Sequence, residues 1–505
     1  MTKTVRHYGM KSMALALGLS MVVSACSGST PVPAESKTAG AAGSASSDLK
    51  QVEISWYYPA TLGIPADLKS VEESVNKITK SKINATVKLN AVASGDYNQK
   101  MNTIVASGEI FDILWTSNWN FDYVQNQSKG AFIELDALID KYAPEVKKSM
   151  PSFVWDATKI EGKIYGLPNY QTVTNREGLI PQKKLLEKYG MNASQFTKLE
   201  DVEPLLAKIK ENEKDLIPFM MDRRGKYGNM MRTNNMETVI NNIAAINLSN
   251  PDKIINMYET PEYKNYLELM RSWFQKGYIN QDAATLKNAN DYSKIGKEAV
   301  GFHNVLKPGG EQEKKAQTGG VDYVYIPFTD VYSGTNTIIT TMQAISRTSK
   351  NPERAMMFLN LVNTDKELFN LLSFGIEGKH YTKNADGTIK LNKDAGYMAA
   401  DWVFGNVFNG LPLEGRDPKI AEMTKKENES AKPSPIMGFK FKADPVSAEI
   451  ANINAVVDEY TPGLSTGTVD TGKLGEFLEK LKKAGSDKVI IEAQKQLDEW
   501  KKSKK

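Results

Sequence analysis

The chain has 505 residues, 41% hydrophobic and 25% charged, with a net charge of +4 at pH 7. One hydrophobic core does not support this length, so we expect two domains. Three of the positive charges, Lys3, Arg6 and Lys11, lie at the N-terminus, which leaves the rest nearly neutral. This balance lacks the basic excess that binds nucleic-acid phosphates, and we expect no nucleic-acid partner.

Residues 1–25 have the pattern of a secretory signal peptide. A basic start is followed by an apolar run over residues 13–23, which is too short to span a bilayer. The run ends at Val23-Ser24-Ala25-Cys26, which resembles the bacterial lipoprotein box, and Cys26 is the one cysteine of the chain. The resemblance implies that Cys26 is lipidated after cleavage. The alternative is an ordinary signal peptide with a free cysteine nearby.

Residues 26–49 are expected to form a flexible linker. Of the 23 residues after Cys26, 18 are Ser, Gly, Ala, Thr or Pro, and none is aromatic. Such a segment cannot bury enough apolar surface to offset the entropy lost on ordering. We therefore expect a lipid-anchored body, residues 50–505, on the outer face of the cytoplasmic membrane, with the lipid as its only membrane contact.

The start of this body alternates strand and helix patterns. Val52, Ile54 and Trp56 alternate with polar residues and predict a strand, and residues 68–78 follow with helical spacing. A second strand pattern spans residues 85–89. A helix pattern then spans residues 97–105, and a buried strand pattern spans residues 111–115. This β-α-β-α-β order predicts a mostly parallel sheet whose strand C-termini present loops to a ligand.

Several motifs along the chain resemble one protein family. Gly95-Asp96-Tyr97-Asn98-Gln99-Lys100, Ala106-Ser107-Gly108-Glu109 and Phe111-Asp112-Ile113-Leu114 resemble the N-terminal lobe of family 1 extracellular solute-binding proteins. These are the receptor subunits of ABC importers, the group that contains maltose-binding protein. Further motifs follow in the family's order at residues 161–168, 273–280, 344–347 and 351–355.

The C-terminal third resembles a narrower branch, the lipoproteins found beside complex-carbohydrate uptake systems of Gram-positive bacteria. Residues 374–381, 402–406 and 484–488 carry this likeness. The resemblance implies an α/β fold of two lobes, with mostly parallel sheets flanked by helices, an interlobe cleft and a helical C-terminal region. It implies that residues 50–167 plus 330–372 form lobe one, and that residues 168–329 plus 374–505 form lobe two. It also places interlobe crossings near residues 168–170, 328–330 and 373–375.

The function implied by the resemblance is capture of a carbohydrate, expected to be an oligosaccharide, and its delivery to the permease subunits of an ABC importer. We expect a monomer that uses no cofactor or metal. A peptide or a polyol remains an alternative ligand. A surface lipoprotein of the same fold that serves signalling or adhesion remains an alternative function.

Enzyme hypotheses have weaker support. Gly463-Leu464-Ser465-Thr466-Gly467 matches a nucleophile elbow, but a helix pattern precedes it and no histidine follows it. A glycoside hydrolase needs two carboxylates across the scissile bond, and Asp112 opens a buried strand, a position suited to holding a loop. The two histidines of the mature chain and a lipidated cysteine do not make a metal cluster. We therefore expect no catalysis.

Candidate ligand contacts are polar and aromatic residues that follow strands or crossings, because sugars present apolar C–H faces and hydroxyls. Trp119 and Trp402 are the leading candidates, one from each expected lobe, since each lies in a loop-like stretch beside an asparagine. Trp56 also fits a core position, and His303 also fits a structural histidine. The full set is Trp56, Tyr58, Thr116, Asn118, Trp119, Tyr170, Gln171, Thr172, His303, Asn304, Trp402 and Asn406.

Overall fold

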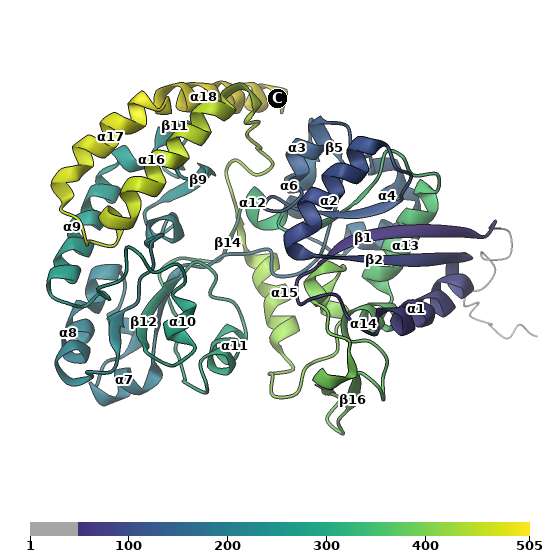
Figure 1. Ribbon diagram of the computed structural model, residues 1–505, viewed down its shortest axis with the longest axis horizontal. Helices are drawn as coiled ribbons and strands as arrows, with labels where there is room; N and C mark the ends of the chain where they lie inside the picture. The colour runs from purple at the N-terminus through teal and green to yellow at the C-terminus, as the bar shows by residue number, and fades with distance from the viewer. Residues whose placement is uncertain (1–48, 505) are drawn as a thin grey trace, which may run out of the picture. The chain divides into compact units, whose positions relative to one another are not determined.

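The computed structural model describes residues 49–504, and residues 1–48 and 505 lie outside it (Figure 1). The predictions for the signal peptide, for Cys26 and for nearly all of the linker therefore concern residues outside the described part. The described residues build two lobes, each around its own hydrophobic core. Both cores combine strands with helices, which confirms the predicted α/β class.

The first lobe contains a five-stranded sheet with the strand order β2-β1-β3-β15-β6. β1 pairs in parallel with β2 and β3, whereas β15 pairs antiparallel with β3 and β6. The sheet is therefore mixed, because β15 runs opposite to the other four strands. The strands are β1 (Val52–Ala60), β2 (Ala85–Ala93), β3 (Ile113–Thr116), β6 (Leu167–Pro168) and β15 (Met342–Ile345).

Helices cover this sheet on the pattern predicted from the sequence. In α1 the side chains of Val71, Val75 and Thr79 fall on one face and are buried, and Asn84 ends the helix with a left-handed φ of 45°. The helices of this lobe are α1 (Leu68–Ile83), α2 (Ser94–Ser107), α3 (Tyr123–Ser128), α4 (Asp136–Tyr142), α5 (Pro144–Lys148), α6 (Ser152–Thr158), α12 (Thr335–Ile338), α13 (Pro352–Thr364) and α14 (Lys366–Phe374). A short hairpin, β4 (Lys159–Ile160) and β5 (Lys163–Ile164), follows α6.

The second lobe has two sheets. A four-stranded sheet has the order β13-β7-β12-β8, and a three-stranded antiparallel sheet has the order β11-β10-β9. The strands are β7 (Gly178–Pro181), β8 (Ile217–Phe219), β9 (Met236–Ile240), β10 (Ala244–Asn247), β11 (Asn250–Asn256), β12 (Glu298–His303) and β13 (Ile326–Pro327). The helices are α7 (Lys183–Lys188), α8 (Glu203–Asn212), α9 (Pro261–Gln275), α10 (Asn290–Ser293), α11 (Gly310–Gln317), α16 (Ser447–Ser465), α17 (Leu474–Lys483) and α18 (Ser486–Ser503).

The C-terminal region is helical, as predicted. α16, α17 and α18 pack on the second core beside α9 and β11 (yellow in Figure 1). Val489, Ala493 and Leu497 of α18 are fully buried there. Burial of this one face ties the end of the chain to lobe two.

Three segments connect the lobes and are hydrogen-bonded to one another. Asn175 of the first segment forms an antiparallel bridge with Tyr332 in β14 (Tyr332–Ser333), and β14 pairs in parallel with β18 (Lys432–Pro433). Helix α15 (Ile420–Ser430) leads into β18. Its buried Asn428 accepts a hydrogen bond from the Val173 amide at 3.1 Å and donates one to the Gln171 carbonyl at 2.7 Å. We call these three connections the hinge segments.

The region after α14 lies in a different place from the one expected. The sequence analysis assigned residues 374–505 to lobe two, but Tyr397, Val403 and Phe404 are buried in the first core. The Phe404 ring packs edge-on against Trp56, with ring centroids 5.6 Å apart. After the hairpin β16 (Tyr381–Lys383) and β17 (Ile389–Leu391), this packing returns the chain to lobe one. The third connection therefore follows at β18, and Pro168 similarly still belongs to the first sheet.

Candidate ligand-binding site

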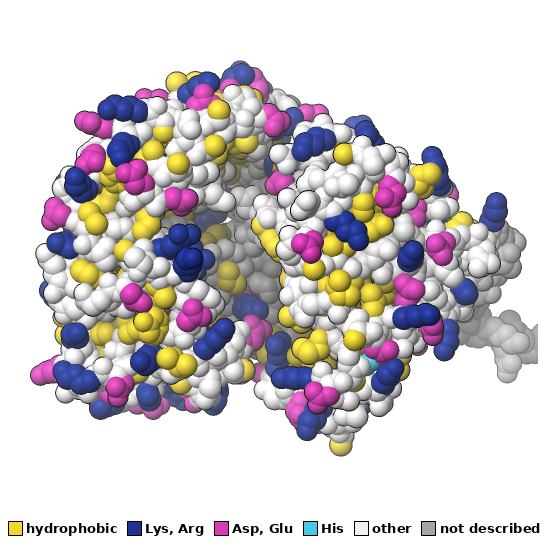
Figure 2. Space-filling view, viewed as in Figure 1, with side chains coloured by type: hydrophobic (Ala, Val, Ile, Leu, Met, Phe, Trp, Pro, Cys, Tyr) yellow, Lys and Arg dark blue, Asp and Glu magenta, His cyan; other side chains and the backbone are white. Residues whose placement is uncertain are grey.

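A groove of about 660 Å³ is lined by residues of both lobes. On the face drawn in Figure 2 the surface is hollowed between the lobes, and acidic and basic side chains are interspersed on both. Lobe one contributes Asn118, Asp122, Val124, Gln125, Ser128, Asn336 and Ile339. Lobe two contributes residues 237–242, 436, 439–444, 450 and 454.

Six side-chain amides line the groove, together with the charged residues Asp122, Glu237, Lys440, Lys442 and Asp444. Asn118, Gln125 and Asn336 belong to lobe one, and Asn241, Asn242 and Asn454 belong to lobe two. The Asn118 amide donates to the Asn336 carbonyl at 2.9 Å, and the Asn242 amide donates to the Asn454 side chain at 3.1 Å. A carboxamide can donate and accept at once. The amides of the groove are therefore suited to a ligand that carries many hydroxyl groups.

Three tryptophans at the C-terminal end of β3 form what we call the tryptophan cluster. Trp115 is fully buried and donates its indole N–H to Thr341 Oγ1 at 2.7 Å. Trp119 is 54% exposed, although its indole N–H is held by the Thr340 carbonyl at 2.9 Å. Its ring lies 5.4 Å from Trp115 and 6.4 Å from Trp402, centroid to centroid. The cluster thus presents a fixed aromatic surface beside Asn118.

Asp401 places a carboxylate next to this cluster. Its Oδ1 accepts a hydrogen bond from the Trp402 backbone amide at 2.8 Å. Burial raises the pKa of Asp401, and the positive charges of Arg416 and Lys307 oppose this shift. Lys307 belongs to lobe two, so this edge of lobe one faces a charge on the other lobe.

Five of the predicted contacts are buried in the structure. Trp56 and Thr116 are fully buried in lobe one, where the Trp56 indole donates to Gln343 Oε1 at 2.9 Å. Both side chains are enclosed by the protein and present no surface to the groove. Tyr58, Tyr170 and Asn406 are also buried. Asn406 Oδ1 accepts the Phe408 amide at 3.1 Å and begins a 3₁₀ turn.

The other predicted contacts keep accessible surface, but Asn118 is the one of the twelve that lines the groove. Gln171 and Thr172 lie at the first hinge segment, near α15. His303 ends β12, and its ring keeps some surface open to water. The protein atoms around it, with the charges of Lys226 and Lys314, lower its pKa to about 4, so it is neutral at pH 7. The carbonyl of the next residue, Asn304, accepts the Arg176 amide at 3.2 Å.

Sequence reasoning missed the lobe-two amides Asn241, Asn242 and Asn454. The available signal was the adjacent asparagine pair directly after a strand, at the position where loops carry polar ligand contacts. Asn454 had no such signal, because it lies in the middle of α16.

The residues weighed for catalysis have structural partners. Ser465 ends α16 and its hydroxyl lies 3.3 Å from Tyr263 Oη. The Asp112 carboxylate accepts the Ser55 amide at 3.0 Å and the Ser349 hydroxyl at 2.6 Å, which ties two loops together. Within residues 49–504, no group of three or more His, Cys, Asp or Glu side chains is arranged to hold a metal ion. In the same range, no helix is long and apolar enough to cross a membrane.

Comparison with known proteins identifies similar chains over most of the length. The model of the family "Bacterial extracellular solute-binding protein" matches residues 63–367, and a domain of unknown function, DUF3502, matches residues 435–502. A carbohydrate ABC transporter substrate-binding protein of Streptococcus pneumoniae is 32% identical, over 87% of this chain and 90% of its own.

Solved structures of solute-binding proteins are also similar to this chain. The crystal structure of the N-glycan transport solute-binding protein NgtS from S. pneumoniae has a TM-score of 0.79 at 30% identity. It covers 90% of this chain and 100% of its own. Structures of NgtS in complex with Man1GlcNAc and with Man5GlcNAc have TM-scores of 0.68 and 0.66. They cover 89% and 90% of this chain, and 99% and 100% of their own, at 29% and 30% identity.

Proposed function

The chain belongs to the family of bacterial extracellular solute-binding proteins, and we propose that it captures an oligosaccharide in the groove between its lobes for an ABC importer. The observation that carries this proposal is the groove itself, lined by amides of both lobes beside the exposed Trp119 ring. The names of the S. pneumoniae relatives support a glycan built from mannose and N-acetylglucosamine as the ligand class.

Each part of the site has a role in holding such a ligand. Trp119 and Trp402 stack on the apolar C–H faces of sugar rings, which aromatic side chains favour. The amides at the two walls exchange hydrogen bonds with ring hydroxyls, and Asp401 accepts a hydroxyl hydrogen beside Trp402. The protein holds the ligand and releases it without chemistry.

Lobe rotation about the hinge segments would close the groove on the ligand. Support comes from the TM-score to NgtS, which is higher for the structure described without a glycan (0.79) than for the complexes with Man1GlcNAc and Man5GlcNAc (0.68 and 0.66). Two lobes that each keep one core and share three hydrogen-bonded strands can rotate as rigid bodies. We infer that the arrangement described here is the one that receives the ligand.

The remaining expectations concern the location and partners of the chain. We propose that Cys26 carries the lipid anchor, that the protein works as a monomer on the outer face of the cytoplasmic membrane, and that permease subunits receive the ligand. Titration calorimetry with Man5GlcNAc tests the central proposal. Chromatography of the recovered glycan tests the absence of hydrolysis.

A further inference from the structure

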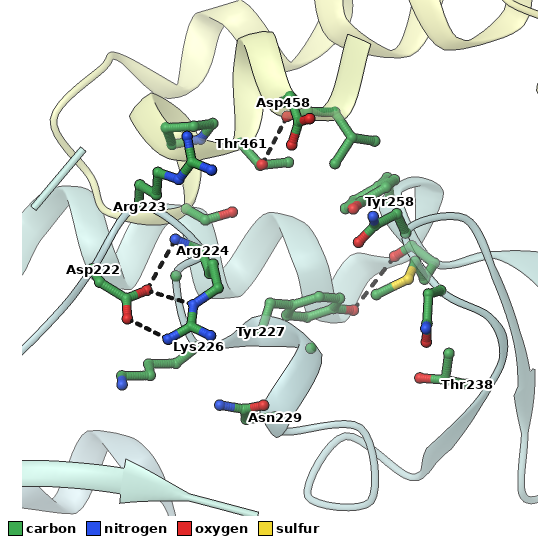
Figure 3. A pocket seen from close by; sticks show the side chains of 18 residues that line it. Asp222, Arg223, Arg224, Lys226, Tyr227, Asn229, Thr238, Tyr258, Asp458 and Thr461 are labelled. Atoms are coloured by element: carbon green, nitrogen blue, oxygen red, sulfur yellow. Dashed lines mark hydrogen bonds and ion pairs between the residues drawn. The ribbon is translucent and has the colours of Figure 1, made fainter. Parts of the chain in front are cut away.

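A second pocket lies next to the groove, in lobe two. It has a volume of about 440 Å³ and is lined by the loop 222–229, by Met257 and Tyr258, and by residues 457, 458, 461, 462 and 465 of α16 (Figure 3). Thr238, Asn241 and Asn242 line both this pocket and the interlobe groove, so the two spaces are neighbours. We call it the α16 pocket.

We propose that the α16 pocket is a second sugar subsite, which holds the outer residues of an oligosaccharide whose inner residues fill the interlobe groove. This inference rests on the proposed function and extends it to a part of the molecule outside the cleft. It also gives a role to the C-terminal region, because α16 lies inside the segment matched by the domain of unknown function.

The base of the pocket is rigid. The rings of Tyr227 and Tyr258 pack edge-on against Tyr263, with centroids 4.8 and 5.0 Å away. The buried Tyr266 hydroxyl donates to the Ser465 carbonyl at 2.8 Å and accepts the Lys226 amide at 2.9 Å. It therefore ties the loop 222–229 to the end of α16, and the pocket needs little rearrangement to receive a ligand.

The loop approaches α16 closely because of one glycine. Gly225 has a left-handed φ of +67°, and a β-carbon there would lie 2.6 Å from Ser465 Cβ. The preceding turn is held by Asp222, whose buried carboxylate accepts Arg224 Nη2 at 2.7 Å and Nε at 3.2 Å. Burial alone would raise the pKa of Asp222, but the Arg224 guanidinium keeps it below its ordinary value, so this ion pair is already satisfied.

Polar groups from opposite walls line the pocket, and Arg223 and Lys226 add positive charge to its lining. Figure 3 shows Asp458 and Thr461 of α16 across the pocket from Asn229 and Thr238. Asp458 is an exposed carboxylate that accepts hydrogen bonds, whereas Asn229 both donates and accepts. Acceptors and amides around the buried tyrosines suit the hydroxyls of a sugar ring, as in the interlobe groove.

Calorimetry with a long and a short glycan tests the subsite on the full-length protein. The wild type should bind Man5GlcNAc more tightly than Man1GlcNAc, because only the longer glycan reaches the α16 pocket. Asp458→Ala, and separately Asn229→Ala on the other wall, should weaken Man5GlcNAc about tenfold and leave Man1GlcNAc within about twofold. The matched control is Glu459→Ala, an exposed carboxylate of the same helix that does not line the pocket.

The outcomes separate the two proposals. If the wild type binds both glycans equally, or if both pocket variants bind Man5GlcNAc like the Glu459→Ala control, the subsite is contradicted and the interlobe site stands. An equal loss for both glycans also contradicts the subsite, because it would show that the variants disturb the groove. A wild type that binds neither glycan contradicts the proposed function and, with it, this inference.

Discussion

Trp119 and Trp402 lie on the same lobe with ring centroids 6.4 Å apart and ring planes at 52°. The sequence analysis placed them on opposite lobes, facing each other across the cleft. Trp402 lies on lobe one because the segment around Phe404 packs against Trp56. Both rings can therefore contact one ligand from the same side, and lobe two contributes amides together with the rings of Phe439 and Phe441.

Trp119→Ala is expected to weaken glycan binding on the order of 30-fold, since loss of a stacking ring in a binding site costs about 2 kcal/mol. The fold should be unaffected, because the ring is 54% exposed. Titration calorimetry, with a thermal unfolding curve for each variant, measures both effects. Trp119→Phe retains a stacking face and should recover most of the affinity. Normal affinity in the alanine variant would remove Trp119 from the site.

Asn428→Ala should lower the free energy of unfolding by about 1–3 kcal/mol. The substitution leaves the Val173 amide and the Gln171 carbonyl without their partner at the first hinge segment. Chemical denaturation measures the change. Asn452→Ala, at an exposed position of α16, serves as the control and should have little effect. Equal stability of the two variants would show that Asn428 does not hold the hinge segments together.

We expect the free energy of unfolding to depend on pH through the side chain of Lys440. Burial and the nearby Lys504 lower its pKa to about 7, and its ammonium donates to the Lys159 carbonyl at 2.7 Å. Between about pH 7 and pH 10 the unfolded chain keeps the Lys440 proton while the folded protein gives it up. The contribution of Lys440 to the free energy of unfolding therefore falls as the pH falls from about 10 toward 7, by up to about 1 kcal/mol per pH unit.

Urea titrations of wild type and Lys440→Met at pH 7, 8 and 9 test this sign. The wild type should gain stability with rising pH relative to the variant. Lys442→Met is the matched control, because Lys442 is exposed and pairs with Glu161. It should keep the wild-type slope over this range. Parallel curves for wild type and Lys440→Met would contradict the prediction.

Cys26→Ser should move the protein from the membrane fraction to the soluble fraction, since this residue is the proposed lipid attachment site. Cell fractionation with immunoblotting measures the change. The variant should unfold at the wild-type temperature, because the two cores begin after residue 50. A variant that stays bound to membranes like the wild type would exclude the anchor.

Small-angle scattering tests lobe closure. Saturating Man5GlcNAc should reduce the radius of gyration, because rotation about the hinge segments brings the lobes together. The comparison needs the same sample with and without glycan, since aggregation changes the same quantity. An unchanged profile with calorimetrically confirmed binding would contradict closure.

Local patterns predicted the parts of the fold that depend on neighbouring residues. The alternation of Val52, Ile54 and Trp56 predicted β1. Of the two residues proposed from the turn after β3, Asn118 lines the groove, whereas Trp119 is not among its lining residues and stays a prediction. The third interlobe connection was placed wrongly, because it depends on packing between Phe404 and Trp56, which no local pattern records. Asn454 could not be found for the same reason. Its helix reaches the groove only through tertiary packing.

Titration of the full-length protein with Man5GlcNAc, followed by chromatography of the recovered glycan, is the decisive experiment for glycan capture. We expect saturable binding of one glycan per chain, a loss of affinity in Trp119→Ala, and a glycan recovered intact. Absence of binding would contradict the proposed ligand, and normal affinity in Trp119→Ala would contradict the site. Recovery of cleaved glycan would show that the chain is an enzyme and not a binding protein.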